Sequence, residues 1–65
     1  RRDKSHLQVA NYLYSKVISQ DPENRIAFAE RGLVLAHLDD WSGAINDFNK
    51  ALSLKMRVTL KREVL

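Results

Sequence analysis

An internal repeat with a period of 34 residues constrains this chain more than any other feature of its sequence. Identical residues recur at that spacing, from position 10 to position 44 and onward, in three pairs: Ala10 and Ala44, Lys16 and Lys50, Ser19 and Ser53. Residues of similar size recur in three further pairs: Leu7 and Trp41, Tyr14 and Phe48, Ile18 and Leu52. Val17, which falls on the smaller Ala51, breaks the match in size. A period in this range is typical of architectures in which each unit packs on its neighbour.

Apolar residues at steps of three and four predict the first two helices. The first covers about residues 4–20, and Pro22 ends it because the residue before a proline avoids helical backbone angles. Its predicted inner face is formed by Leu7, Ala10, Leu13, Tyr14, Val17 and Ile18. The second covers about 24–38, with either Asp21–Pro22 or Asn24 as its start signal. It is apolar on more than one face, so we expect contacts from two sides, with Gly32 marking a close approach.

A third helix is predicted to begin at Trp41, with Asp40 as its N-cap. Its periodic apolar residues are Trp41, Ala44, Ile45, Phe48, Ala51 and Leu52. Two continuations remain open. Either the helix runs on through an apolar row at Leu52, Met56, Leu60 and Val64, or residues 55–58 turn and a short fourth helix starts near Thr59. We favour the single long helix.

The complete hairpin resembles the tetratricopeptide repeat (TPR) family, whose repeat length is also 34 residues. The resemblance rests on Phe28, Gly32, Leu35, Trp41, Ala44, Phe48 and Ala51, and on Asp21–Pro22, which resembles the closing dipeptide of a preceding repeat. It implies an all-α fold of antiparallel helical hairpins, about one and a half repeats long. Residues 4–22 would be the second helix of one repeat, 24–54 a complete repeat and 55–65 a helical extension, so that 1–65 forms a single TPR-like fragment. Gly32 and Ala44 would let two helices approach, with Phe28, Leu35, Trp41 and Phe48 filling the space around them and Ala51 leaving room for a next repeat.

Three positions depart from the family pattern. Arg31 stands where leucine is usual, and Asp39 stands at a tight turn where glycine is common. Lys55 and Met56 replace the closing aspartate and proline. The last departure puts a following repeat of normal geometry in doubt and favours a longer, terminal third helix.

Composition limits the classes of function. The chain has 65 residues, no cysteine and a net charge of +3, so it can hold neither a disulfide nor a cysteine–zinc site. The lack of cysteine fits a cytoplasmic protein. The sequence begins at Arg1 without methionine, so we expect it to be a piece of a longer protein. No apolar run in it reaches the roughly 20 residues of a membrane span.

No constellation for catalysis or metal binding is found in the sequence. Within three or four residues along a helix, His6 has only Asp3 and His37 has only Asp40 as a further ligand, which is fewer than zinc needs. Asp39–Asp40 lacks the further oxygens of a calcium loop. Neither glycine belongs to a phosphate-binding loop. We therefore expect no enzyme activity, no metal and no cofactor.

The resemblance implies that the first helix of the hairpin lines a concave peptide-binding groove. The corresponding residues are Ile26, Ala29, Leu33, Ala36 and His37. An apolar groove of this kind suits an amphipathic helix or an apolar peptide and not a carboxylate clamp. Alternatively these residues pack against another part of the parent protein or against a second copy.

The basic residues of the C-terminal half define a second candidate surface. They are Lys50, Lys55, Arg57, Lys61 and Arg62. They can dock on an acidic partner, or they can simply be solvated near a helix C-terminus. Nucleic-acid binding is a weak alternative, because Trp41, Phe48 and Tyr14 are expected in the core and only Tyr12 outside it. The favoured function is a protein-interaction scaffold that self-associates or binds a partner protein, because one and a half repeats leave apolar surface uncovered.

Overall fold

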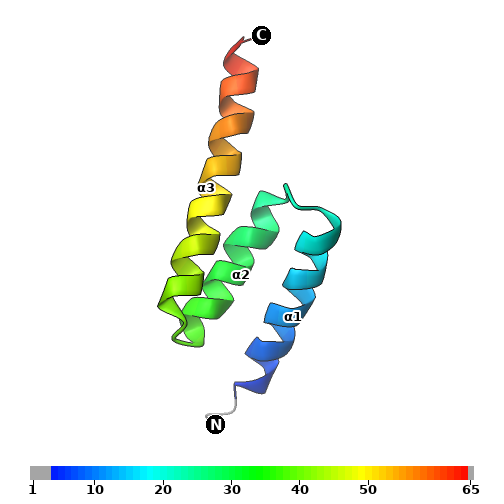
Figure 1. Ribbon diagram of the computed structural model, residues 1–65, viewed down its shortest axis with the longest axis vertical. Helices are drawn as coiled ribbons and strands as arrows, with labels where there is room; N and C mark the ends of the chain where they lie inside the picture. The colour runs from blue at the N-terminus through cyan, green and yellow to red at the C-terminus, as the bar shows by residue number, and fades with distance from the viewer. Residues whose placement is uncertain (1–3, 65) are drawn as a thin grey trace.

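Three antiparallel helices build the structure, a computed structural model that describes residues 4–64, with side chains described for residues 4–57. They are α1 (Ser5–Gln20), α2 (Arg25–His37) and α3 (Trp41–Val64). In the described part of the chain α2 contacts both neighbours, whereas α1 and α3 do not contact each other (Figure 1). The predicted all-α fold is confirmed, and so is a second helix that is contacted from two sides.

The third helix is a single long element. It runs for 24 residues to Val64, which confirms the extended helix and excludes the alternative with a turn at residues 55–58. Figure 1 shows its last turns projecting beyond the end of α2. The molecule is therefore elongated, with dimensions of 50 × 22 × 16 Å.

Polar side chains cap the N-termini of the second and third helices. The Asn24 side chain accepts a hydrogen bond from the Ala27 N–H at 3.1 Å, which decides between the two predicted start signals of α2. The Asp40 carboxylate accepts one from the Gly43 N–H at 3.0 Å, which confirms the predicted cap of α3. Each cap satisfies a helix-terminal donor that has no partner within its own helix.

Gly32 allows α2 and α3 to approach closely, as its place in the sequence predicts. A Cβ atom at this position would lie 2.9 Å from two carbons of the Phe48 ring and 3.2 Å from the Asp47 Cβ. Real Cβ atoms do not tolerate the first distance, so any larger residue would push Phe48 away from its present place.

The apolar core is small and lies mainly between α2 and α3. The buried apolar residues are Ala27, Phe28, Val34, Ala44 and Leu54. The prediction that Trp41 fills space around the hairpin contact is wrong, because its side chain is 60% exposed. Phe48 lies at the contact with Gly32, yet it too is 42% exposed. The physical reason is that Trp41, and the part of Phe48 turned away from Gly32, lie on a side of α3 that no other helix of the described structure covers.

One polar network joins all three helices. Arg31 on α2 donates two hydrogen bonds to the Asp47 carboxylate on α3, at 2.6 and 2.9 Å. A third N–H of Arg31 donates to the Ser15 hydroxyl on α1 at 3.0 Å. Asp47 is only 5% exposed, and the guanidinium also lies 5.6 Å from the centre of the Phe28 ring. Arg31, one of the departures from the tetratricopeptide pattern, is therefore the residue that bridges the three helices.

The charge state of Arg31 is fixed by this environment. Hydrogen bonding to Asp47 raises the pKa of Arg31 above its ordinary value, burial lowers it, and the charge of Asp47 raises it further. When folding raises the pKa of a cationic group, the charged group stabilises the folded state at every pH below its unfolded-state pKa. This stabilisation is lost only as the pH rises through the folded-state pKa. For arginine the loss would begin above about pH 12, so Arg31 stays charged at any pH at which the protein is handled.

Substitution of Arg31 is expected to lower the free energy of unfolding more than substitution of Asp47. Arg31→Leu leaves a buried carboxylate without its partner and should lower the free energy of unfolding by about 3 kcal/mol. Asp47→Ala frees a guanidinium that can turn to water and should cost about 1–2 kcal/mol. The double variant should be more stable than Arg31→Leu alone. Urea unfolding followed by circular dichroism measures all three. Equal losses in the two single variants, with simple additivity, would contradict the account.

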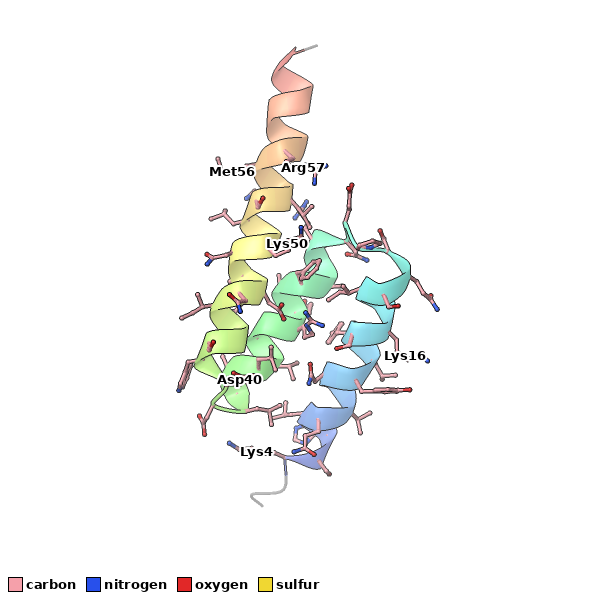
Figure 2. All side chains as sticks on the ribbon, in the orientation of Figure 1. Lys4, Lys16, Asp40, Lys50, Met56 and Arg57 are labelled. Carbon is pink, nitrogen blue, oxygen red and sulfur yellow. The ribbon has the colours of Figure 1, made fainter. Side chains whose placement is uncertain are left out.

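The turn between α2 and α3 contains a backbone conformation that glycine adopts more readily. Asp39 has φ of 65°, which is the left-handed region expected from the family pattern. The Lys4 ammonium donates to the His37 carbonyl at 3.1 Å and lies 3.7 Å from the Asp39 carboxylate. Figure 2 shows Lys4 reaching from the start of α1 toward this turn. Both partners in the ion pair are exposed, so the pair adds little stability.

Replacement of Asp39 by glycine should stabilise the protein. The left-handed conformation costs an L-residue roughly 1–2 kcal/mol, less for aspartate, and the freedom of glycine in the unfolded chain offsets part of the gain. We expect Asp39→Gly to raise the free energy of unfolding by about 0.5 kcal/mol. Asp39→Asn, which keeps the tolerance for this conformation and removes the ion pair, is the control and should be nearly neutral. A glycine variant less stable than the asparagine variant would show that the ion pair outweighs the strain.

Candidate functional site

A continuous row of large apolar side chains lies exposed along α3. The row, called the α3 stripe below, consists of Trp41, Ile45, Phe48, Leu52 and Met56, each 42–60% exposed. Steps of four, three, four and four place these residues on one side of the helix. In Figure 2 Met56 lies on the side of α3 away from α2, and Arg57 lies on the opposite side. Exposed apolar surface this continuous is typical of an interaction site.

The solvent-facing flank of the α3 stripe is polar and uncharged. It consists of Ser42, Asn46, Asn49 and Ser53, all exposed. In the first 14 residues of α3 the charged side chains are Asp47, which is paired with Arg31, and Lys50. At about 100° per residue Lys50 lies on the other side of the helix from the stripe. Depletion of charge around an apolar patch is a feature of protein interface cores.

The 34-residue repeat gives the α3 stripe a covered counterpart. Shifted back by one period, the first four stripe positions fall on Leu7, Asn11, Tyr14 and Ile18 of α1. These four residues are partly buried, and α2 is the element that α1 packs against in the described structure. The α3 stripe is thus equivalent to the face of α1 that α2 covers, but, apart from the contact of Phe48 with Gly32, no helix of the described structure packs against it. The 34-residue spacing that relates α3 to α1 can be read from the sequence, but the exposure of Trp41 was not predicted from it.

The outer side of α1 shows the reverse relation. Leu13 and Val17 are exposed, and one period later their positions are taken by Asp47 and Ala51, which face α2. Their predicted place on the inner face of the first helix is therefore wrong, because α2 covers a different side of α1. Lys16, which Figure 2 shows on this outer side, lies 5.6 Å from the ring centre of the exposed Tyr12. Apolar side chains are consequently exposed on the two outer helices of the layer, α1 and α3.

A shallow depression of about 390 Å³ opens between α2 and α3. It is lined by Arg25, Ile26, Ala29, Glu30, Phe48, Ala51, Leu52 and Lys55. Two residues of the predicted groove, Ile26 and Ala29, therefore lie beside the α3 stripe. The other three, Leu33, Ala36 and His37, lie further along α2 and do not line the depression; Leu33 and His37 are exposed. The sequence did not predict that α3 would supply half of the lining.

The predicted basic surface is dispersed in the described structure. Lys50 and Lys55 are exposed, and Lys55 lines the depression. Arg57 approaches Glu23 of the α1–α2 loop at 3.5 Å, and both side chains are exposed. Lys61 and Arg62 lie in the last turns of α3, outside the residues whose side chains are described. The three described cations do not converge on one point.

The described part of the chain contains no group of three or more histidine, cysteine, aspartate or glutamate side chains that could hold a metal ion. His6 and His37 are both exposed. Within the same residues, no helix has the length and apolar character needed to cross a membrane.

Comparison with known proteins gives no relative for this chain. No family model, no curated protein and no solved structure matches it.

Two leucines on α3 provide a direct test of which side of the helix is open. Leu54 is 4% exposed in the contact with α2, whereas Leu52 in the α3 stripe is 57% exposed. Leu54→Ala should lower the free energy of unfolding by about 2–4 kcal/mol, and Leu52→Ala by less than about 1 kcal/mol. Chemical denaturation at low protein concentration measures both. Similar losses in the two variants would show that the α3 stripe is packed within the chain.

Proposed function

We propose that this chain is a protein-interaction scaffold of the tetratricopeptide type, which accepts a helix of a partner protein on the α3 stripe. The observation that carries the proposal is the repeat relation between α1 and α3. Where α1 presents this face, α2 packs on it; where α3 presents the equivalent face, Trp41, Ile45, Phe48, Leu52 and Met56 are exposed. Packing of each unit on its neighbour is how repeat proteins gain stability.

The chemistry of the surface defines the kind of partner. An apolar stripe with an uncharged flank suits the apolar face of an amphipathic helix, bound through residues at steps of three and four. Ile26 and Ala29 extend this surface across the depression onto α2. Binding of a peptide along the remaining predicted groove residues, Leu33, Ala36 and His37, belongs to the same proposal. The scaffold function assigns no catalytic residue and no cofactor.

Trp41 supplies the measurement that tests the proposal. It is the only tryptophan in the chain, and it lies at one end of the α3 stripe. A synthetic peptide with the sequence of residues 24–38 carries the helix that covers the equivalent face of α1. Titration of this peptide should shift Trp41 fluorescence to shorter wavelength as the indole leaves water.

Matched variants locate the binding. Leu52→Glu changes an exposed stripe residue and should abolish the shift. Leu13→Glu changes a residue of similar exposure on the outer side of α1 and should leave the shift unchanged. No shift at any peptide concentration would count against a helix-binding scaffold. Binding that is lost at high salt and insensitive to Leu52→Glu would favour the basic adaptor instead, because exposed charges are screened.

A further inference from the structure

The α3 stripe is nearly symmetric about its own midpoint. Trp41 and Met56 are centred on position 48.5, and Ile45 and Leu52 are centred on the same position. Phe48 lies directly beside it. Two such stripes laid antiparallel therefore place Trp41 opposite Met56 of the second copy and Ile45 opposite Leu52. A two-fold interface requires a surface that is complementary to itself in this way.

The pairs formed by this arrangement are chemically compatible. Trp41 would meet a methionine, whose thioether makes favourable contacts with aromatic rings. Ile45 would meet a leucine, so that two aliphatic side chains are buried together. The two Phe48 rings would meet near the axis, where aromatic pairs contribute more than their buried area alone.

The charged residues of α3 are compatible with a second copy on this face. The net charge of +3 opposes association of two chains, so the register must keep cations apart. In this register Lys55 falls opposite Ser42 of the second copy, and Lys50 falls opposite Asp47, since both pairs are also centred on position 48.5. Neither lysine is therefore placed opposite another cation.

The second helix has the same symmetry about the same level. Ile26 and Leu33 are centred on position 29.5, next to Ala29, and both are at least half exposed. Ala29 and Phe48 line the same depression, so one axis can relate both helices to their copies. Leu33 of the second copy would then approach Ile26 and enter the depression. The arrangement resembles a four-helix layer made of two α2–α3 pairs.

The available surface is sufficient for a stable dimer. A standard interface takes about 800 Å² from each partner, which is roughly 15% of the 5164 Å² accessible surface of this chain. Five stripe residues, two residues of α2 and the uncharged flank together provide an area of that order.

We propose that a second copy of this chain covers the α3 stripe in antiparallel orientation, with the two-fold axis beside Phe48. The inference rests on the proposed function, since it names the partner of the same surface. It also specifies a register, which makes it testable residue by residue.

Cysteine cross-linking tests the register, because the natural chain has no cysteine to interfere. Ile45→Cys and Leu52→Cys change two exposed residues. A mixture of the two variants should form a disulfide-linked heterodimer under mild oxidation, and each variant alone should give at least about tenfold less product. A Val9→Cys and Leu13→Cys pair on the outer side of α1 is the control and should not cross-link. Efficient 45–45 or 52–52 products would overturn the antiparallel register.

Sedimentation equilibrium of the unmodified chain tests the association itself. We expect a monomer–dimer equilibrium that Ile45→Glu weakens at least about a hundredfold, since each substitution removes two buried contacts per dimer. Leu13→Glu should leave the equilibrium unchanged. If Ile45→Glu unfolds the chain, the cross-linking of the cysteine variants still shows whether a second copy covers the α3 stripe in the antiparallel register.

The outcomes separate this inference from the proposed function. A monomer at all concentrations that still binds the residue 24–38 peptide would overturn the second copy and leave the scaffold intact. A monomer that binds no peptide would overturn both. A dimer that persists in Ile45→Glu and is lost in Leu13→Glu would place self-association on α1 and overturn the proposed interface.

Discussion

The hydrogen-bonded contact between Arg31 and Asp47 is the interaction on which the rest of the structure depends. It fixes α2 against α3 at the level where Gly32 lets the helices meet. The same guanidinium donates a hydrogen bond to the Ser15 hydroxyl on α1. The orientation of α1 therefore depends on Arg31, whose own position is fixed by Asp47 of α3. A buried ion pair of this kind contributes little net stability, but each of its members is costly to leave alone. It therefore specifies one arrangement of helices whose apolar contacts alone are few.

The scarcity of buried apolar residues explains why so much apolar surface remains outside. No large side chain among the described residues is fully buried, and α1 contributes no buried residue at all. A chain of this length buries only about 60% of the surface exposed by its unfolded form. Helices that carry apolar residues on two sides, as α2 and α3 do, gain from further neighbours. Only α2 has neighbours on both sides in this structure.

The elements of the fold follow from the sequence because their causes are local. Asp40, Asn24 and Pro22 indicate where helices begin and end, and Gly32 indicates the close approach. The exposure of Trp41 was not predicted, because periodicity shows which residues share a side of a helix and not which side a neighbour covers. The pairing of Arg31 with Asp47 was also missed. Arg31 was recognised only as a departure from a pattern, and the aspartate lies 16 residues away on another helix.

The weak attachment of α1 has a consequence for motion. None of its residues is buried, and its polar contacts include the Ser15 hydrogen bond and, from the residue before the helix, the exposed Lys4 contacts. Sub-global opening of a protein begins where buried contacts are fewest. Detachment of α1 would break the hydrogen bond between Ser15 and Arg31 but leave the contact between α2 and α3, with its ion pair, in place. The amide protons of α1 should then exchange with solvent before those of the hairpin, as a separate cooperative unit within a chain of only 65 residues.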